Sequence, residues 1–152
     1  MRTCICSPCG ILGYGFPQES FQRALAEKPD AIVVDAGSTD AGPHKLGAGV
    51  AIVSRMAAKK DLRLLMQGAR ELDIPLVIGS AGGSGAHIHT EWTLSIIREL
   101  CDEMDWHPKT AVIWADISNE VILDAMAQGR IEKMSENVPD LTPETLTQTN
   151  GV

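Results

Sequence analysis

Two glycine-containing stretches carry the polar residues best suited to chemistry: "DAGSTDAGPHKLG" at residues 35–47 and "GSAGGSGAHIHTEW" at residues 79–92. In the second, Gly82, Gly83 and Gly85 permit backbone conformations in which successive N–H groups point inward at an anion. A helix that begins near the end of this stretch would add the positive end of its dipole. We predict a site for a phosphate, a carboxylate or a thioester enolate oxygen, with a tight structural turn as the alternative.

Two histidines follow these glycines as His87 and His89, and Glu91 lies two residues further on. Because histidine titrates near neutral pH, one of them suffices for general acid or base catalysis. His89 is the better candidate because it lies closer to the expected helix start, whereas a hydrogen bond to backbone is an equal alternative for His87. A metal site would need further ligands from the other stretch, such as Asp35, Asp40 or His44.

Asp35 ends an apolar run, and its carboxylate could bind a substrate hydroxyl, hold a divalent ion with Asp40 or abstract a proton if its pKa were raised. Both aspartates could instead stabilise turns through their own backbone. A functional role is favoured for Asp35, and the two roles are balanced for Asp40. Asp116 follows a later apolar run, but "DISNE" favours capping of the next helix.

Composition limits the classes of partner. The 152 residues include 20 Asp and Glu against 13 Lys and Arg, for a net charge of −7, so a basic face for nucleic acid is not expected. No apolar run approaches the roughly 20 residues that span a bilayer. These features predict a cytoplasmic protein that binds neither nucleic acid nor membrane.

Three cysteines cluster in "CICSPCG" as Cys4, Cys6 and Cys9. A structural zinc site would need a second pair of ligands, and Cys4 and Cys6 alternate as residues of one strand face do. Buried strand cysteines are therefore favoured over metal ligands. Cys9 could act as a nucleophile only if its pKa were lowered.

Short apolar runs alternate with helical patterns along the chain. We expect strands at residues 3–6, 31–37, 74–80 and 110–118, and helices at residues 18–28, 57–73, 91–104 and 119–130. This pattern predicts an α/β fold: a Rossmann-like three-layer sandwich with a mostly parallel sheet of about four strands and helices on both faces. The domain is expected to cover residues 1–134, followed by a polar tail or linker at 135–152. Every loop named above would then lie at the carboxyl edge of the sheet, where open α/β folds bind ligands.

The chain resembles the N-terminal part of the acyclic terpene utilisation family. The resemblance rests on "GILGYGFPQESFQRAL", "PDAIVVDAGSTDAGPHKLG", "SRMAAKKDLRLLMQGARELDIPLVIGSAGGSGAHIHTEWTLSIIREL" and "LTPETL", in that order along almost the whole chain. It implies catabolism of branched acids and isoprenoid-derived acyl-CoA thioesters in bacteria. Family chains are longer, so we expect a shortened member, one subunit of a split enzyme or a module that needs a partner chain.

From the residues and the resemblance together, we expect an enzyme or enzyme subunit that acts on a small branched carboxylate or acyl-CoA thioester by lyase or hydratase chemistry. His89 and Asp35 are its predicted catalytic residues. The substrate-binding residues are predicted to be Gly13, Gly15, Ser38, Thr39, Asp40, Ser80, Gly82, Gly83, Gly85 and Glu91. A divalent metal cofactor is left open. The alternatives are a non-catalytic subunit in a homo- or hetero-oligomer, and a metal-dependent hydrolase built on His87, His89 and the Asp35 loop.

Overall fold

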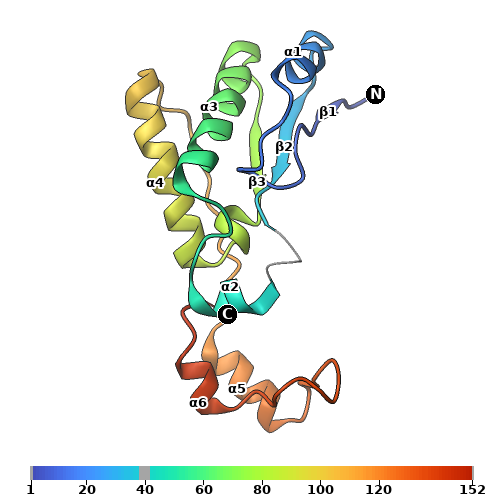
Figure 1. Ribbon diagram of the computed structural model, residues 1–152, viewed down its shortest axis with the longest axis vertical. Coiled ribbons are helices and arrows are strands. Elements are labelled where there is room, and N and C mark those ends of the chain that lie inside the picture. The colour runs from blue at the N-terminus through green and yellow to red at the C-terminus, as the bar shows by residue number, and fades with distance from the viewer. Residues whose placement is uncertain (1, 38–41, 152) are drawn as a thin grey trace.

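The computed structural model describes residues 2–37 and 42–151, and Figure 1 shows the arrangement of its elements. The elements in chain order are β1 (Ile5–Cys6), α1 (Gln18–Ala26), β2 (Ala31–Asp35), α2 (Gly42–Ala48), α3 (Arg55–Leu72), β3 (Leu76–Gly79), the 3₁₀ turn η2 (Ala81–Gly83), α4 (His87–Met104), α5 (Asn119–Ala127) and α6 (Pro143–Thr147). None of the helices within these described ranges is long and apolar enough to cross a membrane.

The three strands form one parallel sheet in the order β1-β2-β3. Cys6 lies opposite Ile32, Val34 opposite Ile78, and Asp35 opposite Gly79. The expectation of a mixed α/β fold with a parallel sheet is confirmed. Since the strands are parallel, the ends of β2 and β3 lie at the same edge of the sheet.

The periodic apolar stripe predicted for residues 57–73 forms α3. Ser54 caps the first turn of this helix, where its hydroxyl accepts the N–H of Ala57 at 3.2 Å. Leu62 and Leu65 are fully buried, and Met66 is nearly so. The helix ends at Leu72, and the next residue, Asp73, adopts the left-handed conformation typical of a helix terminus.

The helices α1, α3 and α4 cover one face of the sheet, not both. Residues of all three helices join a single buried cluster with Ile32 and Val34 of β2. Successive right-handed crossovers that step in the same direction, from β1 to β2 to β3, place each connecting helix on the same side. The prediction of helices on both faces is therefore wrong for the described residues, which form two layers.

The expected fourth strand at residues 110–118 does not form. This segment is exposed along its length and carries no ladder of strand hydrogen bonds, although Ile113 and Trp114 are apolar. Its backbone is bonded to the body of the protein through the Ala115 N–H, which donates to the Gly85 carbonyl at 3.1 Å. Strand formation requires a partner backbone, which periodicity within the segment does not supply.

The segment beyond residue 134 folds back on the body of the protein. It contains α6, whose Leu146 is buried, and Figure 1 shows the C-terminus beside α2. The N–H of Asn150 donates to the Gly47 carbonyl at 2.8 Å, and its side-chain amide donates to the Ala48 carbonyl at 3.1 Å. The tail thus contributes contacts to α2, a short helix within what the sequence predicted as a loop. The domain boundary at residue 134 stays a prediction.

Candidate functional site at the carboxyl edge of the sheet

The ends of β2 and β3 bring Asp35 and Ser80 together. Asp35 is exposed, and its Oδ1 atom accepts the N–H of Gly37 at 2.7 Å, as in an Asx turn. A Cβ atom built on Gly37 would lie 2.5 Å from the Cβ of Ser80 and 3.2 Å from that same Oδ1 atom. Ser80 holds the left-handed conformation, with φ of 49°, which is uncommon for a residue with a side chain. Asp35 and Ser80 therefore lie side by side at the carboxyl edge of the sheet.

The glycine turn after Ser80 is closed by its own hydrogen bonds. The N–H of Gly83 donates to the Ser80 carbonyl at 2.9 Å, and that of Gly85 donates to the Ala81 carbonyl at 3.2 Å. Gly82 lies so close to α4 that an added Cβ would be 2.2 Å from the carbonyl oxygen of His89. These contacts favour the tight-turn interpretation of the glycines. An anion-binding role for the amides of Gly83 and Gly85 would require the turn to open.

The positive end of α4 holds a carboxylate from the protein itself. The helix begins at His87, four residues before the predicted start, and the His87 N–H donates to Oδ2 of Asp116 at 2.7 Å. The predicted role of Asp116 as the cap of the following helix is wrong, because Ser118 caps α5 by accepting the Val121 N–H. A carboxylate at a helix N-terminus is stabilised by the helix dipole. Asp116 therefore occupies a position expected for an anionic ligand.

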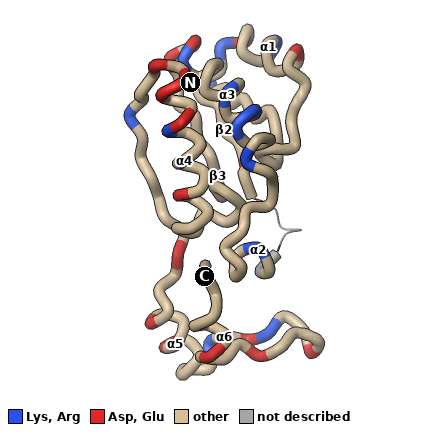
Figure 2. Tube along the Cα trace, turned by 60° about the vertical axis from the view of Figure 1, so that its left-hand side comes forward, with Lys and Arg blue, Asp and Glu red and all other residues tan. Residues whose placement is uncertain are grey.

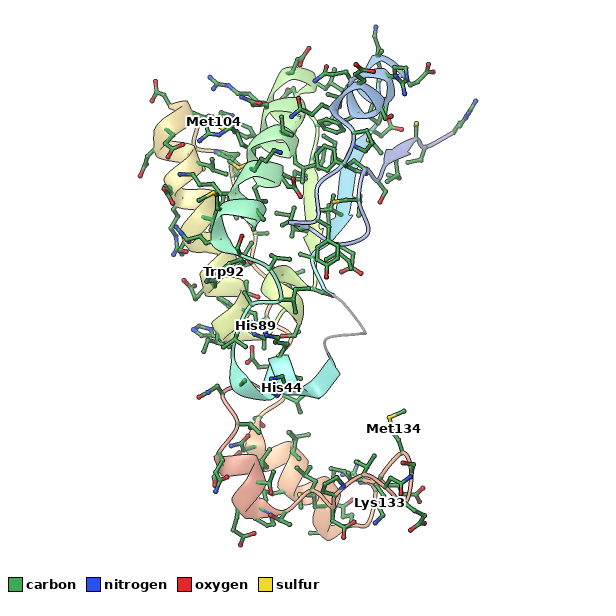
Figure 3. The ribbon with its side chains drawn as sticks, viewed as in Figure 1. His44, His89, Trp92, Met104, Lys133 and Met134 are labelled. Carbon is green, nitrogen blue, oxygen red and sulfur yellow. The ribbon has the colours of Figure 1, made fainter. Side chains whose placement is uncertain are left out.

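His89 lies inside the first turn of α4 and is 2% exposed. Its Nδ1 atom is 2.6 Å from the hydroxyl of Ser84, and its Nε2 atom is 3.1 Å from the carbonyl oxygen of Val50. A carbonyl can only accept, so Nε2 carries a proton, and in the tautomer protonated at Nε2 alone Nδ1 accepts the Ser84 hydroxyl. Figure 3 shows His89 at the base of α4, near α2 and its labelled His44.

Ser84 is the site residue that sequence reasoning missed. It is half-buried, and its oxygen also accepts the N–H of Ala86 at 3.1 Å. A serine just before a helix start is typical of a capping position. The sequence pattern therefore did not indicate that Ser84 contacts a histidine. The next residue is Gly85, and a Cβ atom built on it would lie 3.7 Å from the Cα of Ser80. The Ser84–His89 pair is thus connected to the edge that carries Asp35 and Ser80.

His87 does not share a site with His89. Both residues belong to α4, and two residues in a helix project about 200° apart. The His87 ring packs against Trp114, with ring centroids 4.5 Å apart. Within the part of the chain that the structure describes, no three His, Cys, Asp or Glu side chains gather to hold a metal ion. The geometry does not bring together the histidine pair on which the metal-dependent hydrolase alternative was built.

Gly13 and Gly15 bind a carboxylate that belongs to the protein. Both amides donate to Oδ2 of Asp61, at 2.8 and 2.9 Å, and Asp61 is 2% exposed on α3. This loop is also tied to the end of β2, because the Leu12 N–H donates to the Asp35 carbonyl at 3.0 Å. Gly13 and Gly15 were predicted to bind substrate, but Asp61 accepts the hydrogen bonds of both amides. Nothing in the helical pattern around Asp61 indicated that it would bind this loop.

Two cysteines of the N-terminal cluster differ in their surroundings: Cys6 belongs to the buried core, and the Cys9 thiol lies near Asp35 and Asp61. Cys6 lies in β1 and is buried, as expected for a strand cysteine. The same prediction is wrong for Cys4, which precedes the strand and is only half-buried. Burial, followed by the charges of Asp61 and Asp35, raises the pKa of the Cys9 thiol to about 11. The condition for a nucleophilic Cys9, a lowered pKa, is not met.

Of the remaining predicted residues, Glu91 lies away from this edge. Glu91 pairs with Arg98 at 3.1 Å, on a partly exposed part of α4. The predicted site residues Ser38, Thr39 and Asp40 lie outside the described residues.

Comparison of the chain with protein-family models, curated proteins and solved structures found no match. The resemblance to the acyclic terpene utilisation family therefore stays a prediction.

Proposed function

We propose that this chain is an enzyme, or a subunit of one, that acts on a small branched carboxylate or acyl-CoA thioester by proton transfer of the lyase or hydratase type. The observation that carries the proposal is the 2.6 Å contact between the Ser84 hydroxyl and Nδ1 of buried His89. Catabolism of isoprenoid-derived acids, the setting implied by the sequence resemblance, is part of the same proposal.

The contact orients the His89 imidazole for use as a base. Val50 fixes the tautomer through Nε2, so the basic lone pair of His89 faces Ser84. A substrate proton next to a carbonyl would pass to the Ser84 oxygen while the Ser84 proton passes to Nδ1. The electron pair of the broken C–H bond would remain on the substrate as an enolate. The resulting imidazolium would keep both partners, since the oxygens of Ser84 and Val50 both accept hydrogen bonds.

Asp35 and Ser80 would position the substrate at the mouth of the site. Both are exposed at the carboxyl edge, and Ser80 offers a hydroxyl to a substrate oxygen. Asp35 would accept a hydrogen bond from a substrate hydroxyl or bind the water added in hydration. The rigid Asx turn at Gly37 holds one oxygen of the Asp35 carboxylate in a defined direction.

Deuterium exchange tests this proposal without knowledge of the full reaction. The purified chain would be incubated in D₂O with isovaleryl-CoA and, separately, with isovalerate, and incorporation at the carbon next to the carbonyl would be measured by mass spectrometry. We expect exchange into the preferred probe above the uncatalysed rate. Ser84→Ala and His89→Gln should each reduce it by about 10²-fold or more, the usual contribution of a general base.

His87→Ala is the matched control, since it removes an exposed histidine two positions away from His89. It should exchange at the wild-type rate. Circular dichroism would show that all variants fold. Absence of exchange in the wild-type chain with both probes, or full exchange in folded His89→Gln, would refute the proposed chemistry.

A second candidate function, a non-catalytic assembly subunit, is favoured by a separate observation: one face of the sheet carries no covering layer among the described residues. Parallel sheets are almost always covered on both faces. If isovaleryl-CoA binds in equilibrium dialysis but undergoes no exchange, this candidate replaces the enzymatic one.

A further inference from the structure

The last turn of α2 is completed by a residue from the segment that follows α6. The final four carbonyls of a helix have no partner within the helix. Here the Lys45 carbonyl accepts the N–H of Val50 at 3.2 Å. The Leu46 carbonyl accepts the N–H of Gly49, which has a φ of +67°, at 3.0 Å. These two bonds form a Schellman motif, which leaves the last two carbonyls of α2 to other donors.

Asn150 donates to both of those carbonyls. Its backbone N–H donates to the Gly47 carbonyl at 2.8 Å, and its side-chain amide donates to the Ala48 carbonyl at 3.1 Å, across 102 positions of the chain. The segment that carries Asn150 is anchored by Leu146 of α6, which is 2% exposed. The end of α2 therefore depends on Asn150 for the partners that its own turn does not supply.

The same turn carries the backbone acceptor of His89. Val50 ends the Schellman motif, and its own carbonyl oxygen lies 3.1 Å from Nε2 of His89. Gly49 is packed between the segment after α6 and the start of α4. A Cβ atom built on Gly49 would lie 2.8 Å from the Cβ of Asn150 and 2.8 Å from Cδ1 of Ile88. Asn150, this turn and the first turn of α4 therefore meet at one place.

We propose that Asn150 is a positioning residue for His89, which acts by holding the Val50 carbonyl against the Nε2 proton. Residues 49–54 form no helix or strand, so the bonds at the end of α2 determine where the Val50 carbonyl lies. Ser84 contacts the other ring nitrogen, and a ring bonded at both nitrogens is held in one orientation. This inference rests on the proposed function, because the orientation matters to catalysis only if His89 is the base.

Exchange of the His89 ring proton with water tests the positioning role without any substrate. In the full chain with isotope-labelled histidine, NMR measures the exchange rate of the Nε2 proton, and the signal that disappears in His89→Gln is assigned to this residue. The wild-type proton should exchange slowly, since it is hydrogen-bonded and His89 is 2% exposed. Asn150→Asp and Asn150→Ala both remove the amide donor, and each should accelerate the exchange about tenfold, the effect of one lost hydrogen bond.

Gln148→Ala is the matched control, because it removes an exposed amide side chain two positions away from Asn150. The ring proton of this variant should exchange at the wild-type rate. Deuterium incorporation into isovaleryl-CoA would be measured on the same proteins. It should fall about tenfold in both Asn150 variants, by the same lost bond, and should not change in Gln148→Ala.

The two measurements separate this inference from the proposed reaction. If the wild-type chain incorporates no deuterium, the proposed reaction fails, and the ring proton still decides the role of Asn150. Circular dichroism would show which variants fold, and Asn150→Ala decides the matter if Asn150→Asp does not fold. The positioning role is overturned by an unchanged ring-proton rate in a folded Asn150 variant, by equal acceleration in Gln148→Ala, or by a wild-type proton that exchanges too fast to observe.

Discussion

The Oδ2 atom of Asp61 lies 2.8 Å from the backbone nitrogen of Gly13 and accepts its hydrogen bond. It also accepts the N–H of Gly15 at 2.9 Å. Asp61 belongs to α3, whereas the two glycines lie in the loop that follows β1. One buried carboxylate therefore joins the helical layer to the carboxyl edge of the sheet. A loop that resembles a binding site in sequence is in this case closed by the protein itself.

Replacement of Asp61 by Ala should destabilise the fold by about 2–4 kcal/mol, because two amides lose a charged acceptor. Asp61→Asn keeps an acceptor oxygen and should cost less. Urea unfolding followed by circular dichroism gives both free energies. Lys60→Ala, an exposed neighbour on the same helix, should change stability by less than about 0.5 kcal/mol. If Asp61→Ala matched this control, Asp61 would not be holding the loop.

Three glycine-to-alanine variants separate close approach from backbone strain. At Gly82, φ is +74° and the new Cβ would meet the His89 carbonyl at 2.2 Å, so we expect a loss of at least about 3 kcal/mol. Gly129 has φ of +64° but open space around it, and its variant should lose about 1 kcal/mol. Gly10 has neither constraint and should tolerate Ala. Equal unfolding free energies for the three variants would contradict this account of the turn.

An ion-pair ladder joins α3 to α4 and should make stability depend on pH. Arg55 and Lys59 pair with Glu99, and Lys59 and Arg63 pair with Glu103; Figure 2 shows the basic residues along α3 and the acidic residues towards the end of α4. Hydrogen bonds from Lys59, and then from the arginines, lower the pKa of both glutamates below their ordinary value of 4.5. Hydrogen bonds to Glu103 and then Glu99 raise the pKa of Lys59 above 10.5.

The glutamate contribution is therefore fully present above pH 4.5 and is lost as the pH falls through the lowered folded-state pKa values. The lysine contribution is present below pH 10.5 and is lost as the pH rises through its raised value. The double variant Glu99→Gln/Glu103→Gln should unfold more easily than wild type at pH 7, and the difference should shrink in acid and in high salt. A difference that stayed constant from pH 7 to pH 3 would show that the ladder does not stabilise the fold.

Cys9 should react slowly with iodoacetamide in the folded protein. A thiol whose pKa is about 11 is roughly one part in a thousand thiolate at pH 8, a few hundredfold less than an ordinary cysteine with a pKa of about 8.5. Asp35→Asn should accelerate its modification by removing a nearby negative charge, whereas Asp105→Asn at the end of α4 should not. Peptide mapping by mass spectrometry after timed alkylation distinguishes Cys9 from the other cysteines. Rapid labelling of folded wild-type Cys9 would show that the thiol is not held protonated.

Local patterns predicted the elements whose formation depends on local sequence. The apolar stripe of α3 and the branched residues of β2 were located correctly, because helical period and strand alternation are properties of a short segment. Residues 110–118 show the limit of this approach. They have the composition of a strand, but whether they form one depends on a neighbouring backbone that is not encoded within the segment.

The same division holds at the candidate site. The sequence by itself determined which loops meet at the carboxyl edge, because parallel strands and short crossovers leave few alternatives. Only the tertiary structure decided which groups bind one another: Ser84 with His89, Asp116 with the N-terminus of α4, and Asp61 with Gly13 across 48 positions of the chain. Whether a hydrogen bond forms depends on distances of a few tenths of an ångström, and no periodicity in a single segment carries that information.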